Sequence, residues 1–265
     1  MPGGSAPPQG SDSVAAMTVE LAHDIHGDGP LLVLIHGITE NRHSWDPLLD
    51  DLATDHRVLR VDLRGHGDSP TADGYGVDEL AADVHALVDE RPLVVGHSLG
   101  GMVATAYGAM FDPRGIVNVD QPLDLAPLQA GLVEQAPVLR SEAFPLFIGA
   151  FFETMRGVLD EDEWARLTGL RRADQDVVLG IWSVLLDSTP DELAAVVGQI
   201  VGGINAPYLS LHGMDPGPAY AGWLQGHIPQ AQVEVWPDLG HYPHLARRQE
   251  FLDRVRAFEL ALPAD

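Results

Sequence analysis

Apolar residues along the chain fall into two patterns that alternate. Short, mostly apolar runs recur, such as Leu31–Ile35 and Leu93–Val95, and turn residues bound each of them. Between these runs apolar residues return with helical spacing, as they do from Trp45 to Leu52. The short runs predict strands buried on both faces, and the spaced residues predict amphipathic helices. The alternation indicates an α/β fold, with a mostly parallel central sheet flanked by helices.

The alternation breaks between residues 121 and 205, where strand patterns vanish and the spacing becomes helical. Phe144, Phe147 and Phe151 fall there at i, i+3 and i+7, which places them on one face of a predicted helix. We expect this segment to be a helical cap inserted into the sheet domain. Because it separates two strands, it must lie over the sheet edge at which the strands end.

The expected division of the chain follows from this break. Residues 17–120 and 206–265 are expected to form the sheet domain, and residues 121–205 the cap. Residues 1–16 are rich in Gly, Pro, Ser and Ala and are expected to be a disordered tail. The tail lacks the basic start and apolar core of a secretory signal, which favours a cytoplasmic protein.

The most informative stretch is Gly96-His97-Ser98-Leu99-Gly100, which follows a predicted strand directly. Small residues then begin a predicted helix near Met102. A serine at a sharp turn from strand to helix needs neighbours without bulk, because the backbone there is strained. Many loops contain a Gly-x-Ser-x-Gly pattern, but the strand and helix around this one favour Ser98 as a nucleophile over a plain loop.

A serine hydroxyl is a weak nucleophile until a base takes its proton. Histidine suits this role because its pKa lies near neutrality. Among the twelve histidines, His241 is the best candidate, since it follows the last predicted strand in a glycine-containing loop. Such a loop lies at the same sheet edge as Ser98. We expect His97 to pack beneath the turn, and His66 to be structural.

Four stretches resemble the α/β-hydrolase family: Leu34–Gly37, Asp62–Ser69, Gly96–Gly101 and Gly240–His241. The resemblance covers almost the whole chain from about residue 17. It implies a catalytic triad in the order serine, acid, histidine. This fold hosts many chemistries, so the resemblance predicts the fold more sharply than it predicts the substrate.

The implied acid is Asp215, which follows a predicted strand and precedes Pro216. The family often has two residues between a glycine and this aspartate, whereas only Met214 separates Gly213 from Asp215. The alternative acid is Asp120, at the end of the preceding strand, because some relatives draw the acid from there.

The predicted oxyanion hole consists of two backbone N–H groups, those of Ile38 and Leu99. His36 is expected to brace the loop that carries Ile38. Side chains expected to contact substrate are His36, Thr39, Phe144, Phe147, Phe151, Trp182 and Tyr242.

These residues predict a serine hydrolase that cleaves a carboxylic ester, or a related small acyl substrate, through an acyl-enzyme on Ser98. A lactone, a thioester, a carbon–carbon bond or a perhydrolase (haloperoxidase) reaction could use the same residues. A protein of another class, a receptor that binds a small ligand without catalysis, is the rival hypothesis. No cofactor is expected, and no metal, because the pairs His23/His26 and His241/His244 lack a third ligand at suitable spacing.

The charge of the chain limits its partners. The formal net charge is −24, and all fifteen basic residues are arginines. A surface with this charge repels nucleic acid and anionic membranes, so we expect neither as a partner. We favour a solvated acidic surface over adaptation to high salt, and the oligomeric state stays open.

Overall fold

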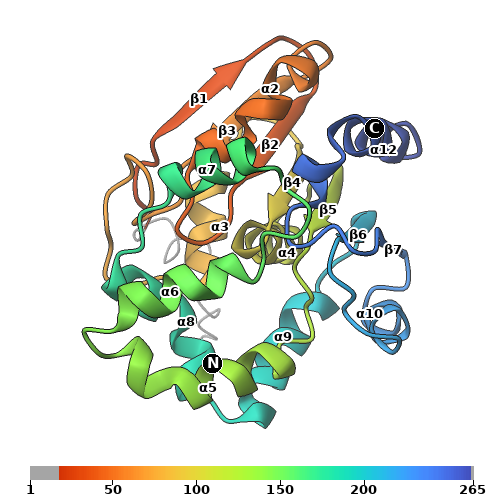
Figure 1. Cartoon of the computed structure of the whole chain (residues 1–265). Helices are drawn as coiled ribbons and strands as arrows, with labels where there is room; N and C mark the ends of the chain where they lie inside the picture. Colours follow the sequence, from red (N-terminus) through yellow and green to blue (C-terminus); the bar gives the residue numbers. More distant parts are fainter. Residues whose placement is uncertain (1–17, 264–265) are drawn as a thin grey trace, which may run out of the picture.

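The computed structural model describes residues 18–263. Seven strands form one sheet in the order β1-β3-β2-β4-β5-β6-β7 (Figure 1). Only β1 pairs in the antiparallel direction, with β3, and the five other pairings are parallel. The strands are β1 His23–His26, β2 Leu31–Ile35, β3 Arg57–Val61, β4 Leu93–His97, β5 Gly115–Val119, β6 Tyr208–His212 and β7 Ala231–Val235. The predicted fold class is confirmed, while the tail expected over residues 1–16 lies outside the described range.

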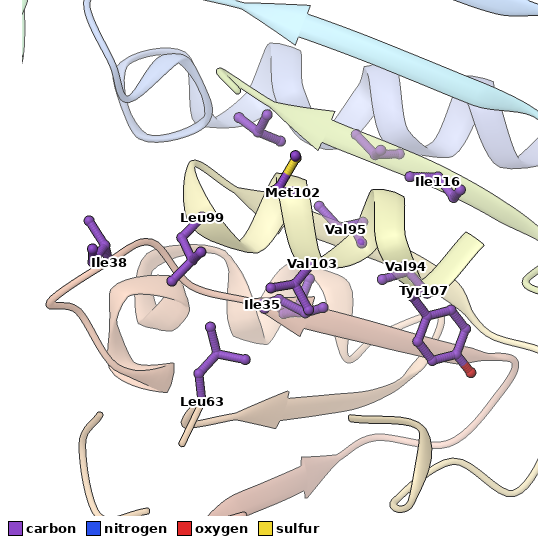
Figure 2. Packing of buried hydrophobic residues seen from close by; sticks show 14 of the residues in the cluster. Ile35, Ile38, Leu63, Val94, Val95, Leu99, Met102, Val103, Tyr107 and Ile116 are labelled. Carbon is purple, nitrogen blue, oxygen red and sulfur yellow. The ribbon is translucent and has the colours of Figure 1, made fainter. Parts of the chain in front are cut away.

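Every residue of β2, β4, β5 and β6 is buried, as expected for parallel strands covered on both faces. Figure 2 shows Val103 and Tyr107 of the helix after β4 packed with Val94, Val95 and Ile116 of the strands. The elements that flank the sheet are η2 Arg42–Trp45, α2 Asp46–Leu52, α3 Val77–His85, α4 Leu99–Met110, α10 Tyr220–His227, α11 Pro243–Ala246 and α12 Arg248–Leu260.

Between β5 and β6 the chain makes five helices, which we call the helical segment (residues 121–205). They are α5 Ala126–Leu139, α6 Phe144–Glu153, α7 Glu161–Leu170, α8 Gln175–Asp187 and α9 Pro190–Gly202. β5 and β6 nevertheless pair directly, with Val117 opposite Leu209. In Figure 1, α5, α6, α8 and α9 gather on one side of the sheet, and α7 lies over the β2–β3 region.

Two glycines bring α4 unusually close to the sheet. A Cβ added to Gly96, in β4, would overlap the carbonyl oxygen of Gly100 in the first turn of α4. A Cβ added to Gly100 would overlap the carbonyl oxygen of Ile35, at the end of β2. The glycines are therefore required by packing, because backbone atoms occupy the space that any side chain would need.

We expect Gly96→Ala to lower the free energy of unfolding by about 2 kcal/mol or more, because the added methyl group forces β4 and α4 apart. Urea unfolding measures this directly. Gly198→Ala, in α9, is the matched control, since a Cβ there meets no atom within 4 Å. It should stabilise the protein by about 0.5–1 kcal/mol. Equal effects of the two substitutions would contradict the packing argument.

Candidate functional site

Ser98 lies at the turn between β4 and α4, with the left-handed backbone angles φ 53° and ψ −123°. Its N–H donates to the carbonyl oxygen of Val119, 2.9 Å away at the end of β5. The N–H of Gly101 donates to the carbonyl oxygen of Ser98 at 2.7 Å. These bonds hold the strained turn in place, so Ser98 sits at the end of the sheet as predicted.

His241 pairs with Asp120. The Nδ1 atom of His241 lies 2.6 Å from Oδ2 of Asp120. The other carboxylate oxygen, Oδ1, accepts hydrogen bonds from the N–H groups of Gly213 at 2.7 Å and Met214 at 3.0 Å. Since a carboxylate oxygen only accepts, Nδ1 carries the proton, and Nε2 is left able to take one.

Asp120 is buried, and burial alone would raise its pKa. Hydrogen bonding and charge from His241, together with the Met214 amide, outweigh burial and lower the pKa below its usual value. The carboxylate is therefore ionised near neutral pH. It can hold the imidazole in one tautomer and stabilise a positive charge on that ring.

The partner of His241 in the structure is thus Asp120, not Asp215 as the resemblance implied. The side chain of Asp215 is exposed, and its Oδ1 accepts a hydrogen bond from the N–H of Gly217 at 2.8 Å. The short loop after β6 directs the amides of Gly213 and Met214 at Asp120 and leaves Asp215 facing outward. Asp120 was the open alternative from sequence.

The loop of His241 is fixed from two sides. The N–H of His241 donates to the carbonyl oxygen of Met155 in the helical segment at 3.0 Å. Its own carbonyl oxygen lies 2.8 Å from Nε2 of His97, which donates to it. His97 therefore packs beside the turn, as expected, and also orients the backbone of His241.

The loop after β2 approaches Ser98 closely. A Cβ added to Gly37 would lie 3.2 Å from Cβ of Ser98. The Nδ1 atom of His36 lies 2.7 Å from the Gly37 carbonyl oxygen, and its Nε2 accepts from the Leu63 N–H at 3.0 Å. Burial lowers the pKa of His36, so the ring stays neutral and braces the loop. It does so from outside the cavity described next, so its proposed contact with substrate is not observed.

A cavity of about 370 Å³ opens beside Ser98. Asp120 and His241 line it, and so do Ile38 and Leu99, the residues of the predicted oxyanion hole. The opposite wall is apolar and comes from the helical segment. Its residues include Leu128 of α5, Phe151 and Phe152 of α6, Ile181, Trp182 and Leu185 of α8, and Leu193 and Val197 of α9.

Two of the expected substrate contacts lie in this wall, Phe151 and Trp182, whose rings meet edge to face at 5.8 Å. Phe144 and Phe147 do not line the cavity. Phe144 is buried in the packing of the helical segment, and Phe147 stacks on Phe151 with ring centroids 6.0 Å apart. The predicted helix is confirmed as α6, but the cavity meets its Phe151 and Phe152 side.

Thr39 and Tyr242 were also expected to contact substrate, and neither lines the cavity. The carbonyl oxygen of Thr39 accepts from the N–H of Arg172 at 2.9 Å. The hydroxyl of Tyr242 donates to Oε1 of Glu40 at 2.8 Å, and the whole side chain is buried. Both residues build the wall behind the site.

Sequence reasoning missed several residues of this region. Glu40 lies three residues after Gly37, among polar neighbours in the sequence, so nothing local marked it as buried. Arg171 gave no signal, because its contact with Tyr242 joins residues 71 positions apart. For α8 and α9 the sequence could predict only that each helix buries an apolar face. It could not predict that these faces line a cavity.

Two kinds of feature are absent from residues 18–263. Among them no three His, Asp or Glu side chains gather as metal ligands would. None of the helices in this part of the chain has the length and apolar character needed to cross a membrane.

Comparison with known proteins identifies the class. Residues 32–254 match the model of the alpha/beta hydrolase family. The chain belongs to this family, and the predicted family and fold are confirmed.

Individual relatives are distant but cover most of the chain. The pimeloyl-(acyl-carrier protein) methyl ester esterase of Aliivibrio salmonicida is 25% identical over 256 residues, covering 91% of this chain and 97% of the relative. The sn-1-specific diacylglycerol lipase ABHD11 of Xenopus laevis is 26% identical, with coverage of 92% and 85%. The crystal structure of the esterase RhEst1 from Rhodococcus sp. ECU1013 superposes with a TM-score of 0.64 at 25% identity, covering 93% of this chain and 98% of that one. These names agree with the predicted class, a carboxylic ester hydrolase.

We expect Asp120→Asn to lower kcat by about 10⁴-fold, because an amide in that place favours the wrong tautomer of His241. Asp215→Asn should leave kcat for a neutral ester nearly unchanged, since its carboxylate bonds only the Gly217 amide. Steady-state kinetics of both purified variants, with circular dichroism to verify folding, provide the test. The opposite ranking would return the acid to Asp215.

Proposed function

We propose that this protein hydrolyses a carboxylic ester through an acyl-enzyme formed on Ser98. The observation that carries the proposal is the His241–Asp120 pair, which shares one cavity with a serine on a left-handed turn. In this proposal Asp120 orients His241, and His241 is the base that activates Ser98.

The reaction proceeds in two halves. Nε2 of His241 takes the proton of Ser98 while Oγ attacks the ester carbonyl carbon, and the N–H groups of Ile38 and Leu99 stabilise the oxyanion. His241 then gives its proton to the departing alkoxide, which leaves as the alcohol. A water molecule, deprotonated by His241, attacks the acyl-enzyme; His241 then returns this proton to Oγ of Ser98 as the carboxylic acid is released.

The cavity supports an uncharged, apolar substrate. Apart from Gln121 and Asp124, its wall in the helical segment consists of apolar side chains, which suit an acyl chain or an apolar alcohol group. Asp124 and Asp215 are exposed lining residues and therefore lie toward the opening, and no arginine or lysine is among the described lining residues. The two carboxylates repel a negatively charged substrate at the opening.

The helical segment acts in this proposal as a cap that sets specificity, because it supplies the apolar wall. The named relatives include an esterase for a methyl ester and a lipase for a diacylglycerol, which support ester cleavage as the reaction. That neither nucleic acid nor a membrane is a partner stays a prediction from the charge of the chain. The cytoplasmic location expected from the sequence stays a prediction.

Ser98→Ala should keep the fold and lose at least about 10⁴-fold in kcat on p-nitrophenyl esters. A fluorescent fluorophosphonate should label the wild-type protein and not the variant. Lactones and thioesters belong in the same substrate panel, since they use the same residues. Ligand binding without turnover of any substrate would favour the rival hypothesis, a receptor.

Charge selection at the opening gives a second test. We compare two methyl esters whose acyl chains end in a neutral group or in a carboxylate. We expect kcat/KM to be at least about fivefold higher for the neutral ester, which corresponds to about 1 kcal/mol in activation free energy. Asp124→Asn should reduce this difference in kcat/KM, because it removes one negative charge at the opening. The local fold should be kept, because the Asn side chain can still accept the hydrogen bond that the Ala126 N–H donates to Asp124 at 3.3 Å. Asp253→Asn, on α12 and away from the cavity, is the control. A preference for the charged ester would refute the expected selectivity.

A further inference from the structure

Behind the site, three side chains form a buried polar chain that the proposed reaction does not use. The hydroxyl of Tyr242 donates to Oε1 of Glu40 at 2.8 Å and accepts from Nη2 of Arg171 at 2.6 Å. Tyr242 is fully buried, and Glu40 is 2% exposed. Arg171 belongs to the helical segment, whereas Glu40 and Tyr242 belong to the loops that surround Ser98.

Glu40 reaches both of those loops. Its Oε2 accepts from the N–H of Gly37 at 3.3 Å, one residue before the proposed oxyanion donor, Ile38. The same oxygen lies 3.7 Å from Nδ1 of His97, whose Nε2 donates to the carbonyl oxygen of His241. One carboxylate therefore contacts the oxyanion loop directly and the loop of the base through one ring.

The partners of Glu40 and Tyr242 determine which of the two carries a negative charge. Burial alone would raise the pKa of Glu40, but the His97 ring, the Arg171 guanidinium and the Tyr242 hydroxyl together hold it well below its usual range. Burial and the negative charge of Glu40 raise the pKa of Tyr242 well above its usual value. Tyr242 therefore keeps its proton and donates it to an ionised carboxylate, which is a strong form of hydrogen bond.

Arg171 is held where it can reach this chain. Its guanidinium lies 4.2 Å from the ring centroid of Phe152 and 4.5 Å from that of Trp164. The N–H of the next residue, Arg172, donates to the carbonyl oxygen of Thr39 in the oxyanion loop. The short stretch after α7 therefore contacts the oxyanion loop through a backbone bond, and it contacts Tyr242, next to His241, through the Arg171 side chain.

We propose that the Arg171–Tyr242–Glu40 chain couples the seating of the helical segment to the positions of the oxyanion loop and of His241. These three are positioning residues, and none of them lines the cavity. The inference rests on the proposed function. Burying an ionised carboxylate costs free energy unless several groups bond to it. The groups that bond to or neighbour the Glu40 carboxylate lie in the oxyanion loop, beside Ser98 and in the loop of His241.

The sharpest test is Tyr242→Phe, which removes one hydroxyl and keeps the ring. On a neutral p-nitrophenyl ester we expect kcat to fall by about 10- to 100-fold with KM within about twofold of wild type, because a small shift of the oxyanion loop weakens transition-state stabilisation. The inhibition constant of an alkyl boronic acid, which forms a tetrahedral adduct on serine, should rise in step with the loss of kcat. Arg140→Gln is the control, because Arg140 makes an exposed ion pair with Asp187 in the same segment.

A double-mutant cycle tests the coupling. Arg171→Gln should lower kcat as well, and the variant carrying both substitutions should lose less than the product of the two single losses. Independent effects, or a Tyr242→Phe variant with wild-type kcat, would overturn the inference. A variant that melts at lower temperature but keeps kcat and the boronic acid affinity would show a structural role only, and would overturn it too.

Hydrogen–deuterium exchange tests the inference without relying on turnover. Tyr242→Phe should speed exchange at least about tenfold in peptides that cover residues 36–41 and 240–242, and Arg140→Gln should not. Unchanged exchange in these peptides would refute the coupling. If the wild-type protein cleaved no ester and these peptides still responded, the proposed function would fail while the coupling stood.

Discussion

The site depends on one constraint of the backbone, the left-handed turns at which the strands end. Four described residues other than glycine have a positive φ, and three of them are Thr39, Ser98 and Asp120. They follow β2, β4 and β5, which lie side by side in the sheet. Such residues cost about 1–3 kcal/mol each and persist only where the surroundings determine them. Here those surroundings are the buried parallel strands β2, β4 and β5, and helix α4, which two glycines allow to pack close to them.

Much of this arrangement could be predicted from the sequence. The apolar runs predicted the strands, because parallel strands covered on both faces need nearly continuous apolar residues. β2, β4 and β5 are indeed buried at every residue. Local chemistry also singled out Ser98 and His241. Ser98 lies between Gly96 and Gly100 directly after a strand, and His241 follows Gly240 in the loop after the last strand. The carboxyl ends of parallel strands lie at one edge of the sheet.

The carboxylate that pairs with His241 and the residues that line the cavity could not be predicted in the same way. Asp120 and Asp215 both follow strands, so sequence spacing leaves both near the same edge. The direction of each side chain depends on which amides the β6 loop presents, and those amides bond Asp120. The sequence similarly predicted the helix α6 and the phenylalanines on one of its faces. The spacing of residues within one helix, however, does not show which face lines the cavity. The Arg171–Tyr242–Glu40 chain joins three distant parts of the sequence, and no local sequence pattern predicts hydrogen bonds between them.

The order of the site along the chain has a consequence for how the protein matures. Ser98 and Asp120 follow adjacent strands whose ladder pairs His97 with Val119, but the amides of Gly213 and Met214 that hold the Asp120 carboxylate come about 90 residues later in the chain. The helical segment lies between Asp120 and these amides, and His241 comes only near the end. During synthesis from the amino terminus, Ser98 and Asp120 are therefore made before the β6 loop that holds the Asp120 carboxylate and before His241. A nascent or prematurely terminated chain holds an unactivated hydroxyl, and hydrolytic power arises only after the apolar wall above it has been translated.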